Sequence, residues 1–180
     1  MFDSPFPHKR ADEAAAFALR YIVERGLADH EVLLLGSGRG ETVRERCPDR
    51  FENEPDGTSS ERIDELVSSS RAVVVASRYE GFGLPAVEAW ARGTPAVVAD
   101  CEAASETLHG FPGLYTAGDY ASFAAALDRV SIIDDAGRRA WSTLANRRFD
   151  WGRAAAEVLS VYRELVAPAE ANGPSEVLAS

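Results

Sequence analysis

The residue types best suited to chemistry lie in one glycine-rich segment, residues 77–88 of this 180-residue sequence. The segment reads Ser-Arg-Tyr-Glu-Gly-Phe-Gly-Leu-Pro-Ala-Val-Glu, so that Glu80 and Glu88 stand on either side of two glycines. An ionised carboxylate accepts hydrogen bonds and donates none. The pair therefore predicts a site that holds the hydroxyl groups of a polyol.

The residues between these two carboxylates are typical of an anion site. Gly81 and Gly83 allow a positive φ angle and place no Cβ in the way of a ligand, and Pro85 suits the first turn of a helix. We predict that the backbone N–H groups of Phe82, Gly83 and Leu84 point outward at a helix N-terminus, where a phosphate is favoured. Phosphate-binding amides beside polyol-binding carboxylates indicate a nucleoside-diphosphate sugar. The alternative interpretation is a tight connection that binds no ligand. In that case the glycines only make the turn, and a carboxylate early in the helix stabilises the helix dipole.

The composition excludes several classes of protein. The net charge of −10 argues against nucleic acid and anionic membranes as partners, because phosphate contacts need an excess of Lys and Arg. The longest purely apolar run, Ala14–Leu19, is far shorter than the roughly 20 residues that cross a bilayer, and no signal-peptide pattern opens the chain. Two cysteines without C-x-x-C spacing fit a reducing compartment. We therefore expect a cytoplasmic protein without a transmembrane segment.

Short apolar runs alternate with helical patterns along the chain. We expect strands at 31–36, 50–53, 71–77, 95–99 and 113–116. We expect helices at 10–25, 41–47, 58–68, 85–92, from 119 onward, at 134–147 and at 151–165. In the last helix Trp151, Val158 and Leu165 are expected to face inward. This alternation predicts an α/β fold, a doubly wound parallel sheet with helices on both faces, which binds ligands at the carboxyl ends of its strands.

Two adjacent stretches carry a family resemblance. Glu-Gly-Phe-Gly-Leu-Pro-Ala-Val-Glu-Ala at 80–89, followed by Gly-Thr-Pro-Ala-Val-Val-Ala at 93–99, resembles the signature of family 4 glycosyltransferases. These are retaining, nucleotide-sugar-dependent enzymes of the GT-B fold, and Glu80 and Glu88 match their pattern of two glutamates separated by seven residues. The resemblance implies a glycosyltransferase of which this chain is the Rossmann-like C-terminal half.

The resemblance extends over most of the chain. Residues 7–10 resemble the family's phosphate-binding lysine segment, 31–38 its strand that ends in Gly-x-Gly, and 149–165 its C-terminal Phe-Ser-Trp helix. We expect a nucleotide-sugar-binding domain over residues 1–167 and a flexible tail at 168–180. The expected order of elements along the chain opens on a helix. The first strand of such a domain is therefore missing from this order. A sheet that lacks a strand exposes backbone edge and apolar surface, which favours a partner or self-association.

The resemblance also implies a role for each matching residue. As catalytic residues, Glu80 would contact the donor sugar and Lys9, the only lysine in the chain, would neutralise the departing diphosphate. Glu88 would bind the ribose hydroxyls of the nucleotide. The amides that would hold the sugar and diphosphate are those of Phe82, Gly83 and Leu84. No metal is required, and the nucleoside-diphosphate sugar is a donor substrate, so no cofactor is expected.

Two departures from the family pattern matter. Ser4 stands where the family usually has an arginine as a second diphosphate ligand, which weakens leaving-group stabilisation unless another arginine substitutes. The resemblance covers only the donor-binding half and leaves out the acceptor-binding half. The alternative hypothesis is therefore a non-catalytic nucleotide-sugar-binding or interaction module that needs a separate acceptor-binding domain or chain. The sugar, the base and the acceptor are not identified, and base specificity would lie near Phe51–Pro55.

Other motifs are weaker. Gly36-Ser37-Gly38 follows an apolar run, but the third glycine of a dinucleotide fingerprint would fall at Glu41, so that motif fails. A glycosidase acid/base pair formed by Glu80 and Glu88 does not explain the glycines between them.

Overall fold

The computed structural model describes residues 9–27, 29–30, 32–35, 51–54 and 57–166. The chain divides into two compact units, Met1–Asn146 and Arg147–Ser180. The expected helix at 41–47, the Gly-x-Gly segment, Ser4 and the tail at 168–180 lie outside the described residues.

The strands of the first unit form two parallel sheets. In the smaller sheet β1 (Val32–Leu35) pairs with β2 (Phe51–Glu54), and the larger has the order β3 (Val73–Val75), β4 (Ala96–Ala99) and β5 (Leu114–Tyr115). Every residue of β3 and β4 is buried, as expected for parallel strands that are covered on both faces. The predicted α/β class with a parallel sheet is confirmed.

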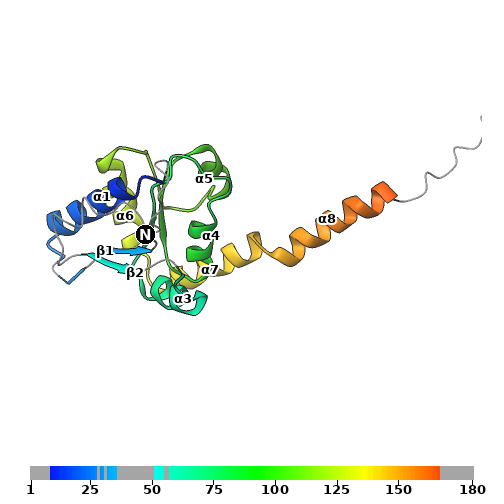
Figure 1. Cartoon of the computed structure of the whole chain (residues 1–180), viewed down its shortest axis with the longest axis horizontal. Helices are drawn as coiled ribbons and strands as arrows, with labels where there is room; N and C mark the ends of the chain where they lie inside the picture. The colour runs from blue at the N-terminus through cyan, green and yellow to red at the C-terminus, as the bar shows by residue number, and fades with distance from the viewer. Residues whose placement is uncertain (1–8, 28, 31, 36–50, 55–56, 167–180) are drawn as a thin grey trace, which may run out of the picture. The chain divides into compact units, whose positions relative to one another are not determined.

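Helices cover both sides of the larger sheet. The helices of the first unit are α1 (Ala11–Glu24), α3 (Ser60–Ser69), α4 (Leu84–Ala91), α5 (Glu102–Thr107), α6 (Tyr120–Ser131) and most of α7 (Asp135–Arg148). The second unit holds the end of α7 and α8 (Trp151–Val166). Helices α1 and α6 lie together on one side of the sheet, and α4 and the part of α7 in the first unit lie on the other (Figure 1).

Each side of the sheet has its own aromatic cluster. Trp90 of α4 is fully buried and packs against Phe111 and Trp141, with ring centroids 5.3 and 5.6 Å away. On the other side Phe17 of α1 lies 5.5 Å from the ring of Phe123 of α6. Aromatic pairs at such distances contribute about 0.5–1.5 kcal/mol beyond the area they bury. These clusters fix α1 and α4 against the same three strands.

Several helix ends carry residue types that suit a cap. Asp119 caps α6 by accepting hydrogen bonds from two backbone N–H groups of its first turn, and Gly26 adopts φ 63° just after α1. The cap of α3 is Ser59, whose hydroxyl accepts from the N–H of Arg62 at 3.2 Å. Helix α5 was not expected, because its N-cap side chain forms no capping bond and its six residues are too few for a periodic pattern.

The last helix differs from expectation. Its span, Trp151–Val166, agrees with the sequence pattern, and Asp150 accepts a hydrogen bond from the N–H of Arg153 at 2.6 Å. The side chains expected to face inward are exposed instead, with Trp151 80% and Leu165 75% accessible. Amphipathic spacing identifies a helix and its apolar face, but it does not supply a surface for that face to contact.

Helix α1 begins at a strained residue. Arg10 is its N-cap and adopts φ 51° and ψ 38°, the one non-glycine residue with positive φ in the described part of the chain. A side chain with a Cβ pays about 1–2 kcal/mol in this left-handed region. An ion pair between the Arg10 guanidinium and Glu13 holds the conformation.

This strain predicts opposite effects of glycine at the N-cap of α1 and at a position inside the helix. Arg10→Gly and Arg10→Ala both remove the guanidinium, so their difference isolates the backbone. We expect the glycine variant to be more stable by about 1 kcal/mol. At the exposed helix-interior position Ala16, by contrast, Ala16→Gly should cost about 0.5–1 kcal/mol. Urea denaturation of the three variants measures both effects, and equal stability of the two Arg10 variants would contradict the strain.

Candidate functional site

An ion pair joins two of the residues that the sequence singles out. The Lys9 ammonium donates to Glu80 Oε1 at 2.7 Å, although the two residues are 71 positions apart in the chain. Their side chains are only 29% and 10% exposed, respectively. Lys9 stands just before α1, and Glu80 lies in the loop at the carboxyl end of β3. The pair therefore lies at the sheet edge where parallel sheets bind ligands.

The glycine-rich loop delivers the chain directly into α4. Gly83 is the N-cap, with φ 85° and ψ 35°, and Pro85 occupies the first turn. The Gly83 carbonyl accepts the first helical bonds, from the N–H groups of Ala86 at 3.0 Å and Val87 at 3.3 Å. The first N–H groups of a helix have no partner within it, and they carry the positive end of its dipole. The N-terminus of α4 thus lies three residues beyond Glu80.

Phe82 and Leu84, on either side of this cap, are each 46% exposed, so the loop presents apolar side chains to solvent. Exposed apolar side chains beside the positive end of a helix dipole suit a ligand that has both a charged part and a flat or apolar part.

Glu88 lies one turn into α4, on the same helix face as Leu84. Its side chain is 52% exposed and lies 3.8 Å from the guanidinium of Arg92. Arg92 is held in turn by Asp64 of α3, whose Oδ1 accepts from Arg92 Nε at 2.9 Å. The structure thus gives Glu88 a fixed cationic neighbour and leaves its carboxylate accessible.

A second contact anchors the start of α1 to the loop after β5. Glu13 Oε1 accepts from the N–H of Gly118 at 3.2 Å, while its other oxygen pairs with Arg10. A Cβ at Gly118, where φ is +82°, would lie 3.5 Å from the Arg10 guanidinium. Lys9 is therefore positioned on one side by Glu80 in the loop after β3. On the other side the loop after β5 holds it through Arg10, Glu13 and Gly118, residues that the sequence analysis did not single out. Their only signal in the sequence is the i,i+3 spacing of Arg10 and Glu13.

Tyr115, the last residue of β5, is buried behind this contact. Its side chain packs edge-on against Phe123 at 5.3 Å, and its hydroxyl has no hydrogen-bond partner among the described residues. Burial, with a smaller contribution from the charge of Glu13, raises the pKa of the Tyr115 hydroxyl well above its usual range. Burial and a 2.5 Å hydrogen bond to Glu24 also raise the pKa of Tyr120 to about 12.

Residues 7–131, more than half of the chain, match the sequence model of the family described as "Glycosyl transferases group 1". The chain belongs to the group 1 glycosyl transferases. Among curated relatives, 122 residues are 35% identical to an MMP alpha-(1->4)-mannosyltransferase of Mycolicibacterium hassiacum, covering 62% of this chain and 28% of the relative. The chain spans about a quarter of the length of the curated relatives that it matches.

Solved structures show the same fold as this group 1 glycosyl transferase chain. TarM superposes with a TM-score of 0.73 at 16% identity, covering 93% of this chain and 34% of that one. Anabaena Alr3699/HepE, solved in complex with UDP and glucose, superposes with a TM-score of 0.62 at 24% identity, covering 89% of this chain and 47% of that one. These neighbours place the chain in the Rossmann-like α/β fold of GT-B glycosyltransferases.

Two searches of the described residues gave negative results. No group of three or more His, Cys, Asp or Glu side chains gathers there in a way that could hold a metal ion. No helix in the described ranges has the length and apolar character needed to cross a membrane.

The buried hydroxyl of Tyr115 predicts a pH-dependent stability. Because the folded state holds this proton above the unfolded pKa of about 10, the free energy of unfolding should fall as pH rises beyond 10. Tyr115→Phe should leave stability at pH 7 unchanged or raise it by about 1 kcal/mol, since it removes an unpaired donor. It should also flatten the alkaline decline in urea melts between pH 8 and 11. Tyr79→Phe, at a side chain that is 74% exposed, is the matched control, and an equally steep decline in both variants would contradict the prediction.

Proposed function

We propose that this chain binds a nucleoside-diphosphate sugar as the donor-binding, C-terminal half of a retaining family 4 glycosyltransferase. The observation that carries the proposal is the Lys9–Glu80 ion pair, which holds a cation beside the N-terminus of α4 at the carboxyl end of β3. Family membership supports the class of reaction. The UDP and glucose bound to the Anabaena neighbour belong to the ligand class proposed here.

The ion pair gives Lys9 and Glu80 complementary roles. In the free protein the carboxylate compensates the ammonium, and neither side chain is well solvated. A diphosphate carries more negative charge than one carboxylate, so it would draw Lys9 toward itself and the helix terminus. Glu80 would then accept hydrogen bonds from the hydroxyls of the donor sugar, which replace its lost partner. As the glycosyl bond breaks, Lys9 would stabilise the charge that develops on the departing diphosphate.

The remaining residues would hold the rest of the donor. The backbone N–H groups of Phe82, Gly83 and Leu84 would bind the diphosphate and sugar, and Glu88, steadied by Arg92, would accept from the ribose hydroxyls. Ser4, where the family usually has an arginine, lies outside the described residues, and Arg10, which follows Lys9 directly, is paired with Glu13. No metal takes part in this proposal, and we assign the activity to the cytoplasm.

Substitutions at the ion pair test the proposal by calorimetry with UDP-, GDP- and ADP-sugars. Lys9→Met should weaken binding of the sugar nucleotide and of the free nucleoside diphosphate by about 10- to 150-fold, because it removes a charge-assisted hydrogen bond of about 1.5–3 kcal/mol. Glu80→Gln should weaken the sugar nucleotide and leave the free diphosphate unchanged. Glu88→Gln should weaken both.

The matched control is Arg139→Gln, which removes one positive charge at an exposed position of α7. It should not change the affinity. Lys9→Arg keeps the charge and should retain most of the affinity. No heat with any of these nucleotides at millimolar concentration would refute the proposed function, and equal losses in Lys9→Met and Arg139→Gln would refute the role of Lys9.

The length of the match gives a second expectation, for catalysis. The curated relatives are about four times as long as the region matched here, and a closed cleft that orients donor and acceptor can supply about 7–11 kcal/mol of a barrier. We therefore expect the purified 180-residue protein to bind donor but to transfer sugar at a negligible rate. This favours a subunit that works with a separate acceptor-binding domain or chain. Robust transfer to an added acceptor, measured by nucleotide release, would contradict it.

A further inference from the structure

An ion pair connects α3 with the end of α4, beside the candidate site. Asp64 Oδ1 accepts from Arg92 Nε at 2.9 Å, and Nη2 of the same guanidinium bonds to the same oxygen. Asp64 lies in the second turn of α3, and Arg92 is the C-cap of α4. When two N–H groups of a planar guanidinium meet one carboxylate, they fix its direction as well as its position. A residue 28 positions earlier in the chain therefore sets where the Arg92 side chain points.

The remaining nitrogen of this guanidinium lies against Glu88. Arg92 Nη1 donates to the Glu88 backbone carbonyl at 3.0 Å and stands 3.8 Å from Glu88 Oε2. A separation of 3.8 Å is too long for a hydrogen bond, although opposite charges still attract across it. The Glu88 carboxylate, which is 52% exposed, thus has a cationic neighbour that uses none of its acceptor positions. Those positions are available to a ligand.

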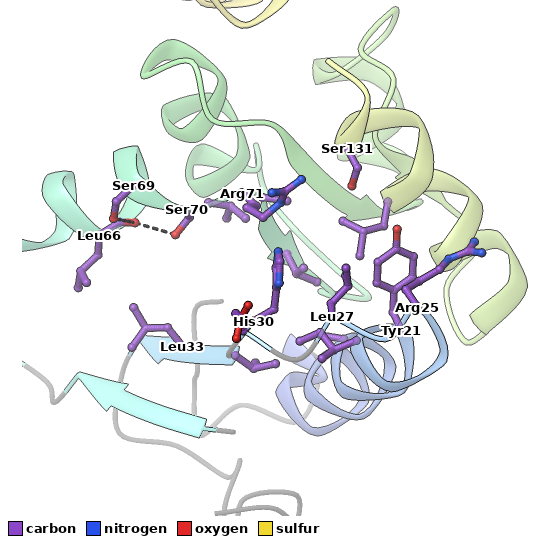
Figure 2. A pocket seen from close by; sticks show the side chains of 18 of the residues that line it. Tyr21, Arg25, Leu27, His30, Leu33, Leu66, Ser69, Ser70, Arg71 and Ser131 are labelled. Atoms are coloured by element: carbon purple, nitrogen blue, oxygen red, sulfur yellow. Dashed lines mark hydrogen bonds between the residues drawn. The ribbon is translucent and has the colours of Figure 1, made fainter. Parts of the chain in front are cut away.

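Helix α3 is anchored at its last turn. The hydroxyls of Ser69 and Ser70 donate to the Leu66 carbonyl at 3.2 and 2.6 Å, and all three residues line a cavity of about 700 Å³ that β1 and β3 also border (Figure 2). The next carbonyl, that of Val67, accepts from the buried hydroxyl of Thr94 at 2.8 Å. Thr94 stands in the turn between α4 and β4. The carboxylate that holds Arg92 therefore comes from a helix whose end is fixed to the turn just after α4.

The restraint on Arg92 has a chemical consequence for Glu88. Hydrogen bonds between a guanidinium and a carboxylate are about 2.7–2.9 Å long, so a guanidinium freed from Asp64 needs to move by only about 1 Å to bond to the Glu88 carboxylate. Once bonded, it would occupy acceptor positions that the hydroxyls of a ligand need. Asp64 thus holds Arg92 close enough to attract Glu88 and too far away to bond to its carboxylate.

We propose that Asp64 is a positioning residue of the nucleoside subsite, which acts through Arg92 to keep the Glu88 carboxylate open to both hydroxyls of a ribose. The inference rests on the proposed function, because that function makes a ribose the ligand of Glu88. It adds α3 to the elements that shape the donor site. Asp64 is 53% exposed, and ion pairs at such positions contribute little to stability. Removal of its carboxylate therefore tests positioning without unfolding the chain.

Calorimetry with paired nucleotides separates positioning from a structural role. The probes are UDP, GDP and ADP and their 2′,3′-dideoxy counterparts, which lack the two hydroxyls proposed to bind Glu88. Asp64→Ala, which places a strong helix former in α3, should weaken binding of the ribonucleotide by about 3- to 10-fold, the effect of losing one hydrogen bond. It should leave the affinity for the dideoxynucleotide unchanged. A structural role alone would weaken the binding of both nucleotides to the same degree.

A double variant tests the path through Arg92. In an Arg92→Ala background no guanidinium remains to be released, so the further change Asp64→Ala should not alter the affinity for the ribonucleotide. The matched control is Asp128→Ala, which breaks another ion pair between an arginine and an aspartate, that of Arg25 with Asp128. This pair involves α6, which packs on the side of the sheet opposite α4, so the control should change neither affinity.

Three results would overturn the inference while the unmodified chain binds the ribonucleotide. Equal losses for the ribonucleotide and the dideoxynucleotide would give Asp64 a structural role. An unchanged affinity in Asp64→Ala would give it no role in the subsite. The same loss with and without Arg92 would remove the path through the guanidinium. If the unmodified chain binds none of these nucleotides, the proposed function itself fails, and the inference fails with it.

Discussion

The ion pair between Lys9 and Glu80 can form only if two distant parts of the chain are held in place independently. Lys9 precedes α1, and α1 is fixed by the contact of Phe17 with Phe123 and by the bond from Gly118 to Glu13. Glu80 follows β3, and its loop must turn into α4 through Gly83. The sheet β3-β4-β5 connects the two arrangements, because α6 packs on one of its sides and α4 on the other. A change in any of these contacts would separate a lysine and a glutamate that are 71 residues apart.

Local chemistry explains why much of this arrangement could be predicted from the sequence. A buried strand, a glycine with positive φ and a proline in the first turn of a helix each leave a signal within a few residues, so the path from β3 through Gly83 into α4 was predictable. The pairing of Lys9 with the same loop has no local signal. That both segments contribute to one site was expected only because both resemble parts of one family's site, and the ion pair itself was not predicted.

The features that sequence missed depend on packing between distant elements. The left-handed Arg10 has no glycine or asparagine to announce it, and it is held by Glu13 and by the closeness of Gly118. The buried hydroxyl of Tyr115 is a consequence of where α1 and α6 meet the sheet. Helix α8 shows the converse: its amphipathic pattern predicted the helix correctly, yet Trp151 is exposed, because a pattern specifies an apolar face without specifying what covers it.

Strand β3 connects the cavity with the site. One of its edges pairs with β4, the other borders the cavity, and its carboxyl end leads to Glu80. With only three residues, it has few ladder bonds to fix its position along the sheet. A strand paired on both edges is held more firmly than one paired on a single edge, since each added neighbour supplies hydrogen bonds to peptide groups that already lie in an apolar interior. Among the described strands β3 pairs with β4 alone, so the loop that carries Glu80 depends on that one pairing.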